Sequence, residues 1–157
     1  MTPEEMKERT RKFALRVIRA AASLPRTFEA RHIGGQLLRA GTSVGANYRA
    51  ACRGRSTAEL IAKMGIVEEE ADESIYWMDV LIEAGITPRP KLAALMTEAN
   101  EILSIVVASI NTARGGVRNT KRPGRGNPQS AIRNPQSAIE AHAVNNKTER
   151  PWLRKSV

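Results

Sequence analysis

Basic side chains near the start of the chain recur at the spacing of one helix face. Arg9, Lys12, Arg16 and Arg19 are separated by three, four and three residues, and residues three or four apart lie on the same side of a helix. Guanidinium and ammonium groups make strong contacts with phosphate oxygens. Together with arginines at helix ends, the candidate nucleic-acid contacts are Arg9, Lys12, Arg16, Arg19, Arg26, Arg49, Arg53 and Arg55.

The same basic stripe also allows a simpler interpretation. It can be an ordinary solvated face, or it can pair with the acidic half of a neighbouring copy. If it binds nucleic acid, we expect recognition of shape and backbone over base readout, because the stripe offers few aromatic side chains for stacking. Structured RNA or an RNA–protein complex is then the favoured partner.

The net charge of +9 is unevenly distributed along the sequence. Residues 1–55 hold 12 Lys/Arg and 4 Asp/Glu, a net +8, whereas residues 56–113 hold 3 and 10, a net −7. Residues 114–157 hold 10 and 2, a net +8. Opposite charge on the two halves of the body predicts that one half faces the other, within the chain or between copies.

A run of acidic residues in the third expected helix invites a metal hypothesis. Glu69 and Glu73, four residues apart, can share a helix face. Ferritin-like di-iron bundles, however, need a Glu-x-x-His motif on two helices. The chain has two histidines, His32 and His142, and does not supply that motif on two helices. We therefore expect no metal site, and we expect these carboxylates to be solvated or paired with arginines.

Glu68 differs from its acidic neighbours because it lies near the apolar line of its helix. A partly buried carboxylate needs a hydrogen-bond donor. Arg39 and Asn47 of the second expected helix are the candidate donors. The sequence thus predicts a structural polar network of Arg39, Asn47 and Glu68 inside the fold.

The residues that could act as nucleophiles lack partners. Ser43, Ser56, Ser74 and Cys52 have no convincing histidine beside them in the pattern. The Gly34-Gly35 pair lacks the lysine and the spacing of a phosphate-binding loop. We expect no catalytic residues, no cofactor and no enzyme activity.

Two glycines lie inside the second expected helix, at Gly41 and Gly45. A glycine inside a helix costs roughly 1 kcal/mol relative to alanine, so a close contact is expected to offset this loss. The neighbour can be another helix of the same chain, a helix of another subunit or a nucleic-acid backbone, and packing is favoured. Tyr76 and Trp77 are likewise expected to anchor helix packing or an oligomer interface.

Four helices are expected to position these residues. The first begins at Thr2, where Thr2 and Glu5 form a capping box, and it ends by Pro25. The second runs from Thr27 to about Cys52. The third opens with a second capping box at Ser56 and ends at Gly85; the fourth restarts at Thr87 and stops at Gly115 and Gly116.

Apolar residues follow a helical period in all four segments, and no strand-like alternation competes with it. Amphipathic helices joined by short turns form bundles. The sequence predicts an all-α, antiparallel, up-down-up-down four-helix bundle over residues 1–115.

The character of the sequence changes after the fourth helix. Residues 116–157 contain four prolines, no apolar periodicity and a tandem repeat of seven residues, NPQSAIR followed by NPQSAIE at 127–140. The proline in each repeat excludes a coiled coil despite the period of seven. We predict a basic, low-complexity and disordered tail.

Two segments resemble one known family. QLLRAGTSVGANYRAACRGRS at residues 36–56 and EEADESIYWMDVLIEAG at residues 69–85 are similar to the 23S rRNA intervening-sequence proteins. This family also includes the accessory variability determinant of diversity-generating retroelements. The resemblance covers about residues 3–114. It implies an antiparallel four-helix bundle assembled as a homopentameric ring, with nucleic acid and, in retroelements, a reverse transcriptase as partners.

These observations lead to one functional hypothesis and one alternative. We expect a non-enzymatic, homo-oligomeric bundle that binds nucleic acid through a basic outer surface. The alternative is a protein-interaction scaffold without specific nucleic-acid binding. A single cysteine and a polar, acidic N-terminus predict a cytoplasmic protein. The lack of a run of 18 apolar residues predicts no membrane partner.

Overall fold

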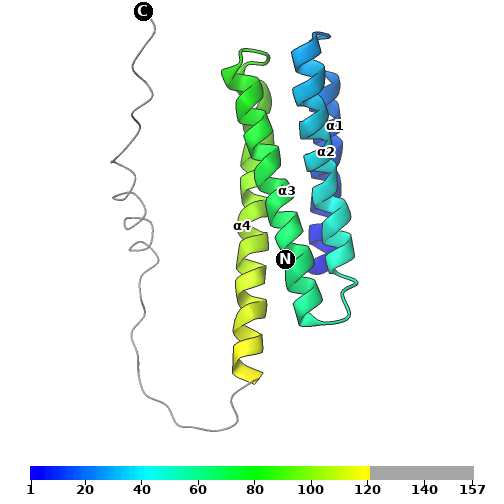
Figure 1. Cartoon of the computed structure of the whole chain (residues 1–157), viewed down its shortest axis with the longest axis vertical. Coiled ribbons are helices and arrows are strands. Elements are labelled where there is room, and N and C mark those ends of the chain that lie inside the picture. The colour runs from blue at the N-terminus through cyan, green and yellow to red at the C-terminus, as the bar shows by residue number, and fades with distance from the viewer. Residues whose placement is uncertain (121–157) are drawn as a thin grey trace, which may run out of the picture. The chain divides into compact units, whose positions relative to one another are not determined.

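The computed structural model describes residues 1–120, with side chains through residue 115. This part of the chain is all helical and contains no strand (Figure 1). The helices, in chain order, are α1 (Pro3–Ala22), α2 (Phe28–Ala51), α3 (Thr57–Glu83) and α4 (Arg89–Thr120). The four-helix, all-α prediction is confirmed. The predicted tail from residue 121 onward lies outside the described residues.

The helix starts follow the local capping signals in the sequence. In the capping box of α1, the Glu5 amide donates to Thr2 Oγ1 at 3.2 Å and the Thr2 amide donates to Glu5 Oε2 at 2.7 Å. Ser56 caps α3, since its hydroxyl accepts from the Glu59 amide at 3.1 Å. The Glu59 carboxylate, however, accepts from the amide of Arg55 at 2.9 Å and not from that of Ser56. The second capping box is therefore incomplete.

The two glycine stop signals behave differently. Gly85 has φ +69° and follows the last turn of α3. The amide of Ile86 donates to Leu81 O and the amide of Gly85 donates to Ile82 O, both at 3.0 Å, as in a Schellman motif. By contrast, α4 continues through Gly115 to Thr120, so the predicted stop at Gly115 and Gly116 is wrong. A glycine that keeps helical dihedral angles only weakens a helix, by roughly 1 kcal/mol.

One hydrophobic core runs through the bundle. α2 packs extensively against both α1 and α3, and α3 packs against α4, whereas the contact of α1 with α4 is smaller. Each helix contributes to the core the row of apolar side chains that its helical spacing predicts. The largest fully buried apolar side chains are Phe13, Met6, Leu37, Met78, Leu81, Ile102, Val17, Val44, Val67 and Val106.

α4 is also long and apolar enough, over Arg89–Gly115, to meet the length and composition of a membrane-spanning helix, with a mean hydropathy of 1.4. Its buried side chains are all part of the bundle core: Leu92, Leu95, Ala99, Ile102, Val106 and Ile110. A core helix reaches such a hydropathy because one side of it is entirely apolar.

Candidate nucleic-acid interface

The α1 stripe divides into two parts in the folded chain. Arg9 faces α4, where its Nε donates to Glu98 Oε1 at 2.6 Å and its Nη2 donates to Glu101. The Arg9 side chain is only 21% exposed, and its hydrogen bond to Glu98 raises the pKa of the guanidinium further. Arg16 Nη1 also lies 4.0 Å from Glu98 Oε2. Arg9 thus joins α1 to α4, and it leaves the set of predicted phosphate contacts.

Lys12 and Arg19 project from α1 into solvent. The Lys12 side chain is 69% exposed and lies 3.7 Å from Glu8 Oε1, but Arg11 engages the same carboxylate more closely, at 2.8 Å. Arg19 is exposed and has no ion pair in the described part of the chain. Exposed ion pairs contribute little, with a median of about 0–1 kcal/mol. Both cations can therefore contact an external anion.

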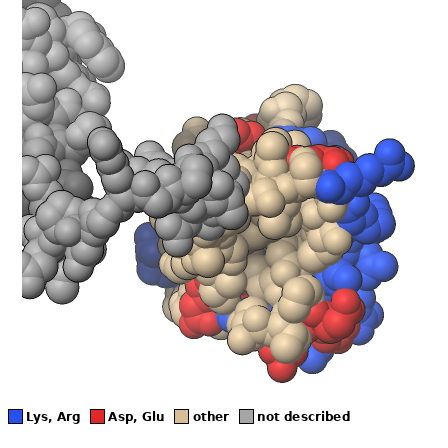
Figure 2. All heavy atoms as spheres, turned by 90° about the horizontal axis from the view of Figure 1, so that it is seen from below, with Lys and Arg blue, Asp and Glu red and all other residues tan. Residues whose placement is uncertain are grey.

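The other candidate arginines lie at different heights of the bundle. Arg26 is in the turn between α1 and α2, and Arg53 and Arg55 are near the turn between α2 and α3, at the opposite end (Figure 1). Arg49 lies on α2, and all four side chains are exposed. Seen along the bundle, Lys and Arg gather on the side that carries α1 and α2 (Figure 2). The predicted residues other than Arg9 thus lie on a basic side of the bundle and do not form one compact pocket.

The predicted polar network has different members. Arg39 donates through Nη2 to Glu73, and its Nη1 lies 3.5 Å from Glu70 Oε2. Asn47 Nδ2 donates to Ser43 O of its own helix at 3.0 Å. Glu68 is half-exposed and takes no part in the hydrogen bonds or ion pairs of residues 1–115. The prediction of an Arg39–Asn47–Glu68 network is therefore wrong in two of its three members.

The two carboxylates beside Arg39 have opposite environments. Its hydrogen bond lowers the pKa of Glu73 below the usual 4.5, and Trp77 Nε1 donates to the same Glu73 oxygen at 2.9 Å. Burial raises the pKa of Glu70 above that value, against the attraction of Arg39. Glu70 Oε2 is buried and accepts no hydrogen bond of good geometry, because 3.5 Å is too long for a strong one. Arg39 therefore binds α2 to α3 mainly through Glu73.

The two interior glycines of α2 face α1. A Cβ built at Gly41 would lie 2.7 Å from both Val17 Cγ1 and Val17 Cγ2, and one built at Gly45 would lie 3.3 Å from Thr10 O. Contacts this short are rarely or never seen for real side chains, so alanine would not fit without movement. Close helix packing, the favoured explanation for both glycines, is thus found within the chain. Buried Thr10 was not singled out from the sequence.

Tyr76 and Trp77 have separate roles although they are neighbours in sequence. Trp77 packs against the core and bonds to Glu73. Tyr76 is 58% exposed, and its ring stands edge-on to that of Trp77 with centroids 4.9 Å apart. Trp77 takes part in helix packing, which is one of the two roles predicted for it. Tyr76 is available to a partner.

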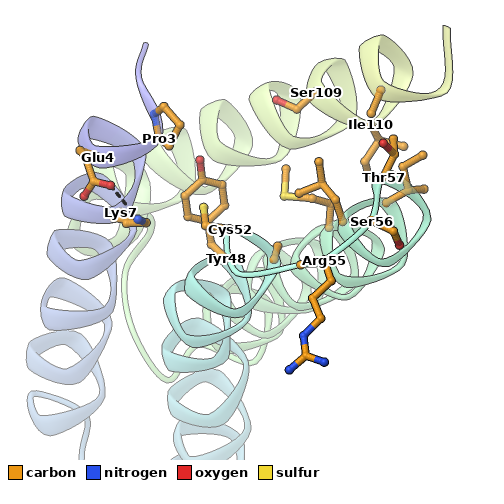
Figure 3. A pocket seen from close by; sticks show the side chains of 16 residues that line it. Pro3, Glu4, Lys7, Tyr48, Cys52, Arg55, Ser56, Thr57, Ser109 and Ile110 are labelled. Carbon is orange, nitrogen blue, oxygen red and sulfur yellow. Dashed lines mark hydrogen bonds and ion pairs between the residues drawn. The ribbon is translucent and has the colours of Figure 1, made fainter. Parts of the chain in front are cut away.

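Sequence reasoning missed a hollow at the end of the bundle near the α2–α3 turn. It has a volume of about 730 Å³ and is lined by α1, α2, α3 and α4. Figure 3 shows Tyr48 and Cys52 side by side at its wall and the Arg55 guanidinium pointing away from it. Burial raises the pKa of Tyr48 to about 12. Lys7 is paired with Glu4 at 2.7 Å, and no histidine lines this hollow in the described part of the chain.

The described side chains do not form a metal centre. One Glu-x-x-His pair does occur, at Glu29 and His32, but both side chains are exposed in the first turns of α2. Within residues 1–115, no three His, Cys, Asp or Glu side chains lie close enough together to hold a metal ion. The geometry instead offers exposed cations on one side of a bundle.

Two comparisons with known proteins find relatives. Residues 4–108 match the family model described as 23S rRNA-intervening sequence protein. A crystal structure of a protein of unknown function from the S23 ribosomal protein family of Bacteroides thetaiotaomicron is 30% identical. The match covers 67% of this chain and 97% of that one, with a TM-score of 0.63. No curated protein matches the chain.

Proposed function

The chain belongs to the 23S rRNA-intervening sequence protein family, and from this premise we propose that it is a non-enzymatic bundle that binds structured RNA. The phosphate backbone of the RNA contacts the side of the bundle that carries α1 and α2. The family description names an rRNA gene context and not an activity, so the argument for binding comes from this chain's own side chains.

The observation that carries the proposal is the contrast between paired and unpaired cations. Arg9 and Arg39 are paired with acids of α4 and α3. Arg19, Arg53 and Arg55 are exposed and have no ion pair within residues 1–115. A surface of uncompensated guanidinium groups releases counterions from phosphates when it binds RNA.

The experiment compares two double variants with the same change in net charge. Lys12→Glu/Arg19→Glu is expected to weaken retention of a structured RNA about tenfold or more and to flatten its dependence on salt, because two phosphate contacts are lost. The control, Lys63→Glu/Lys91→Glu, changes a half-exposed lysine of α3 and an exposed lysine of α4 and is expected to keep most of the affinity. Equal losses in both variants would show that only net charge matters and would contradict the proposal.

The basic segment from residue 116 onward can bind polyanions by itself, since residues 116–157 hold 9 Lys/Arg and 2 Asp/Glu, a net charge of +7. Both double variants are therefore assayed in the full chain and in a chain ending at Arg118. If RNA retention disappears with the truncation alone, the binding surface is not on the bundle.

A second candidate function is a scaffold that binds a protein, and the exposed Tyr76 favours it. A reverse transcriptase is the candidate protein partner implied by the resemblance to retroelement proteins. RNA retention that changes little between low and moderate salt would favour this scaffold. We also propose that the helices run antiparallel, that copies assemble into a ring of five and that the protein acts in the cytoplasm.

A further inference from the structure

The hollow near the α2–α3 turn has the size of a small-molecule site. It measures about 730 Å³ and is lined by all four helices, and we call it the end hollow. Small-molecule sites in proteins are typically hollows of about 300–1,000 Å³ with a mainly apolar lining and a few polar groups that fix orientation. The end hollow falls within this range, and a position between the helices of a bundle is a common one for such sites.

The lining contributed by α3 and α4 is apolar. Met64 and Ile110 are buried beneath the hollow, and the half-buried side chains of Leu60, Ile61 and Ala113 complete this part of its wall. Apolar surface that faces water in a concave site favours the binding of an apolar molecule, because the contact removes that surface from water. This part of the hollow therefore suits the apolar body of a ligand.

Tyr48 brings a buried hydroxyl to the opposite wall. Its side chain is only 8% exposed, and Figure 3 shows its hydroxyl pointing from α2 toward the space between Pro3 of α1 and Ser109 of α4. None of the hydrogen bonds within residues 1–115 includes this hydroxyl. Cys52 beside it offers a thiol, which hydrogen-bonds only weakly. A buried polar group without a good partner is unfavourable, and an oxygen atom of a ligand would satisfy it.

The Tyr48 hydroxyl is a hydrogen-bond donor at neutral pH. Burial raises its pKa to about 12, so the phenol keeps its proton. A protonated phenol donates one hydrogen bond, and a carbonyl oxygen is an acceptor that carries no proton of its own. The matching group on a ligand is therefore a carbonyl oxygen.

The charged groups around the end hollow do not ask for a charged ligand. Lys7 Nζ lies 2.7 Å from Glu4 Oε1, so these two charges compensate each other. The Arg55 guanidinium points away from the hollow (Figure 3). A charged group placed against the apolar wall would lose its hydration without gaining an unpaired partner. The electrostatics thus favour an uncharged molecule.

We propose that the end hollow binds an uncharged, mainly apolar small molecule whose carbonyl oxygen accepts a hydrogen bond from the Tyr48 hydroxyl. The apolar body of this molecule lies against Leu60, Ile61 and Met64. The site is independent of the proposed RNA contact, because neither Lys12 nor Arg19 lines the hollow.

The chain contains a reporter for this site. Cys52 is its single cysteine, is half-buried and lies in the wall of the end hollow. A molecule in the hollow should therefore slow the reaction of Cys52 with a thiol reagent in the full chain. The rate as a function of probe concentration gives the dissociation constant, and free cysteine under the same conditions shows whether a probe affects the reagent itself.

Three probes of similar shape separate the hydrogen bond from the apolar contact. Acetophenone carries a carbonyl oxygen, isopropylbenzene has a methyl group in place of that oxygen, and benzoate is charged. Acetophenone and isopropylbenzene are both expected to protect Cys52, and benzoate is expected to bind about tenfold more weakly than acetophenone or worse. Tyr48→Phe should weaken the binding of acetophenone roughly threefold to tenfold and leave that of isopropylbenzene unchanged.

A matched pair of variants on α4 tests the place of binding. Ala113→Phe adds a large side chain to the wall of the end hollow and should weaken the protection of Cys52 by both apolar probes about tenfold or more. Ala108→Phe makes the same change at an exposed position of α4 that does not line the hollow, and protection should be unchanged. Circular dichroism of each variant establishes that the helices are intact, and if Tyr48→Phe fails this check the pair on α4 still decides whether the hollow binds the probes.

Each contrary result would contradict a different part of the inference. If neither apolar probe protects Cys52, or if both α4 variants behave alike, the end hollow is not a binding site. If Tyr48→Phe changes the binding of acetophenone and isopropylbenzene equally, the hydroxyl does not select a carbonyl oxygen. If benzoate binds as tightly as acetophenone, the site does not require an uncharged molecule.

Discussion

α2 contacts its two neighbours by opposite means. Toward α1 it presents glycines, and Val17 and the backbone of Thr10 lie directly on them. Toward α3 it presents Arg39, whose long side chain reaches Glu70 and Glu73. At these glycines α2 leaves no room for a side chain, whereas toward α3 it uses one of the longest side chains. The difference teaches that the α1–α2 contact is specified by shape and the α2–α3 contact partly by charge.

The two kinds of contact respond differently to substitution. Overfilling a close-packed site costs about 1–3 kcal/mol and occasionally more, and the cost does not depend on pH or salt. A half-exposed ion pair contributes about 0–1 kcal/mol and is screened by salt. Substitutions on the α1 side of α2 should therefore have the larger effects.

The largest effect is expected from Gly41→Leu. Val17 is fully buried and β-branched, so its methyl groups, 2.7 Å from the position of a new Cβ, cannot rotate away. We expect the free energy of unfolding to fall by about 3 kcal/mol, measured by urea denaturation monitored by circular dichroism.

The matched control is Gly35→Leu on the same helix, where a Cβ would meet nothing. This variant should be slightly more stable than the unaltered chain, because leucine favours helices over glycine by roughly 1 kcal/mol. Equal destabilisation by both substitutions would mean that the contact with α1 is not the reason why position 41 requires glycine.

The sequence predicts the features that depend on neighbouring residues and misses those that depend on residues far apart in the chain. The caps at Thr2 and Ser56 and the turn at Gly85 depend on residues within a few positions of each other, and they are confirmed. The helical period also predicts the core. Two interior glycines indicate close packing, but nothing in the sequence specifies that Val17 and Thr10 lie against them.

The errors have the same origin. Arg9 donates a hydrogen bond to Glu98, which lies 89 residues away in the sequence. The spacing of the basic residues on α1 therefore cannot show which of them have acidic partners on α4. Arg39 reaches Glu70 and Glu73 and not Glu68, because the choice among neighbouring acids depends on the register between α2 and α3. Periodicity assigns residues to the faces of one helix, and register between helices depends on side-chain shapes along the whole seam.

A smaller effect is expected on the α3 side, from Glu73→Gln. The pKa of Glu73 is lowered by the hydrogen bond from Arg39, so its carboxylate stabilises the fold at neutral pH. With a third of its side chain exposed, we expect a loss of about 0.5–1 kcal/mol at pH 7. Thermal unfolding at low and high salt measures it, and high salt should reduce the difference. A loss that does not change with salt would point to packing instead.

The pH dependence of that loss gives a further check. A carboxylate whose folded pKa is lowered contributes stability above its usual 4.5, and this contribution disappears as the pH falls through the lower folded value. The unaltered chain and Glu73→Gln should therefore converge in stability as the pH falls below 4.5 and through the lowered pKa of folded Glu73. A difference that stays constant as the pH is lowered throughout the acidic range would contradict the assignment of the ion pair.

Glu70→Gln is expected to act in the opposite direction although it changes the neighbouring acid of the same arginine. Burial raises the pKa of Glu70 in the folded state above the usual 4.5. The folded state therefore loses stability as the pH rises from 4.5 through this higher pKa, because ionising the buried carboxyl is unfavourable. At pH 7 the neutral amide should stabilise the chain by a few tenths of a kcal/mol up to about 1 kcal/mol. This gain should vanish near pH 4, and a loss at pH 7 would show that Arg39 compensates Glu70 fully.

The smallest effect is expected at Gly34, a third glycine on the α1 side of α2. A Cβ there would lie 2.7 Å from Leu24 Cδ1, as close as the contact at Gly41, but Cδ1 is the far end of a flexible and half-exposed side chain. Leu24 can rotate, so the cost of Gly34→Ala and the gain in helix propensity should nearly cancel, within about 0.5 kcal/mol. A loss as large as that of Gly41→Leu would mean that the distance to the neighbour, and not its freedom to move, decides where α2 needs glycine.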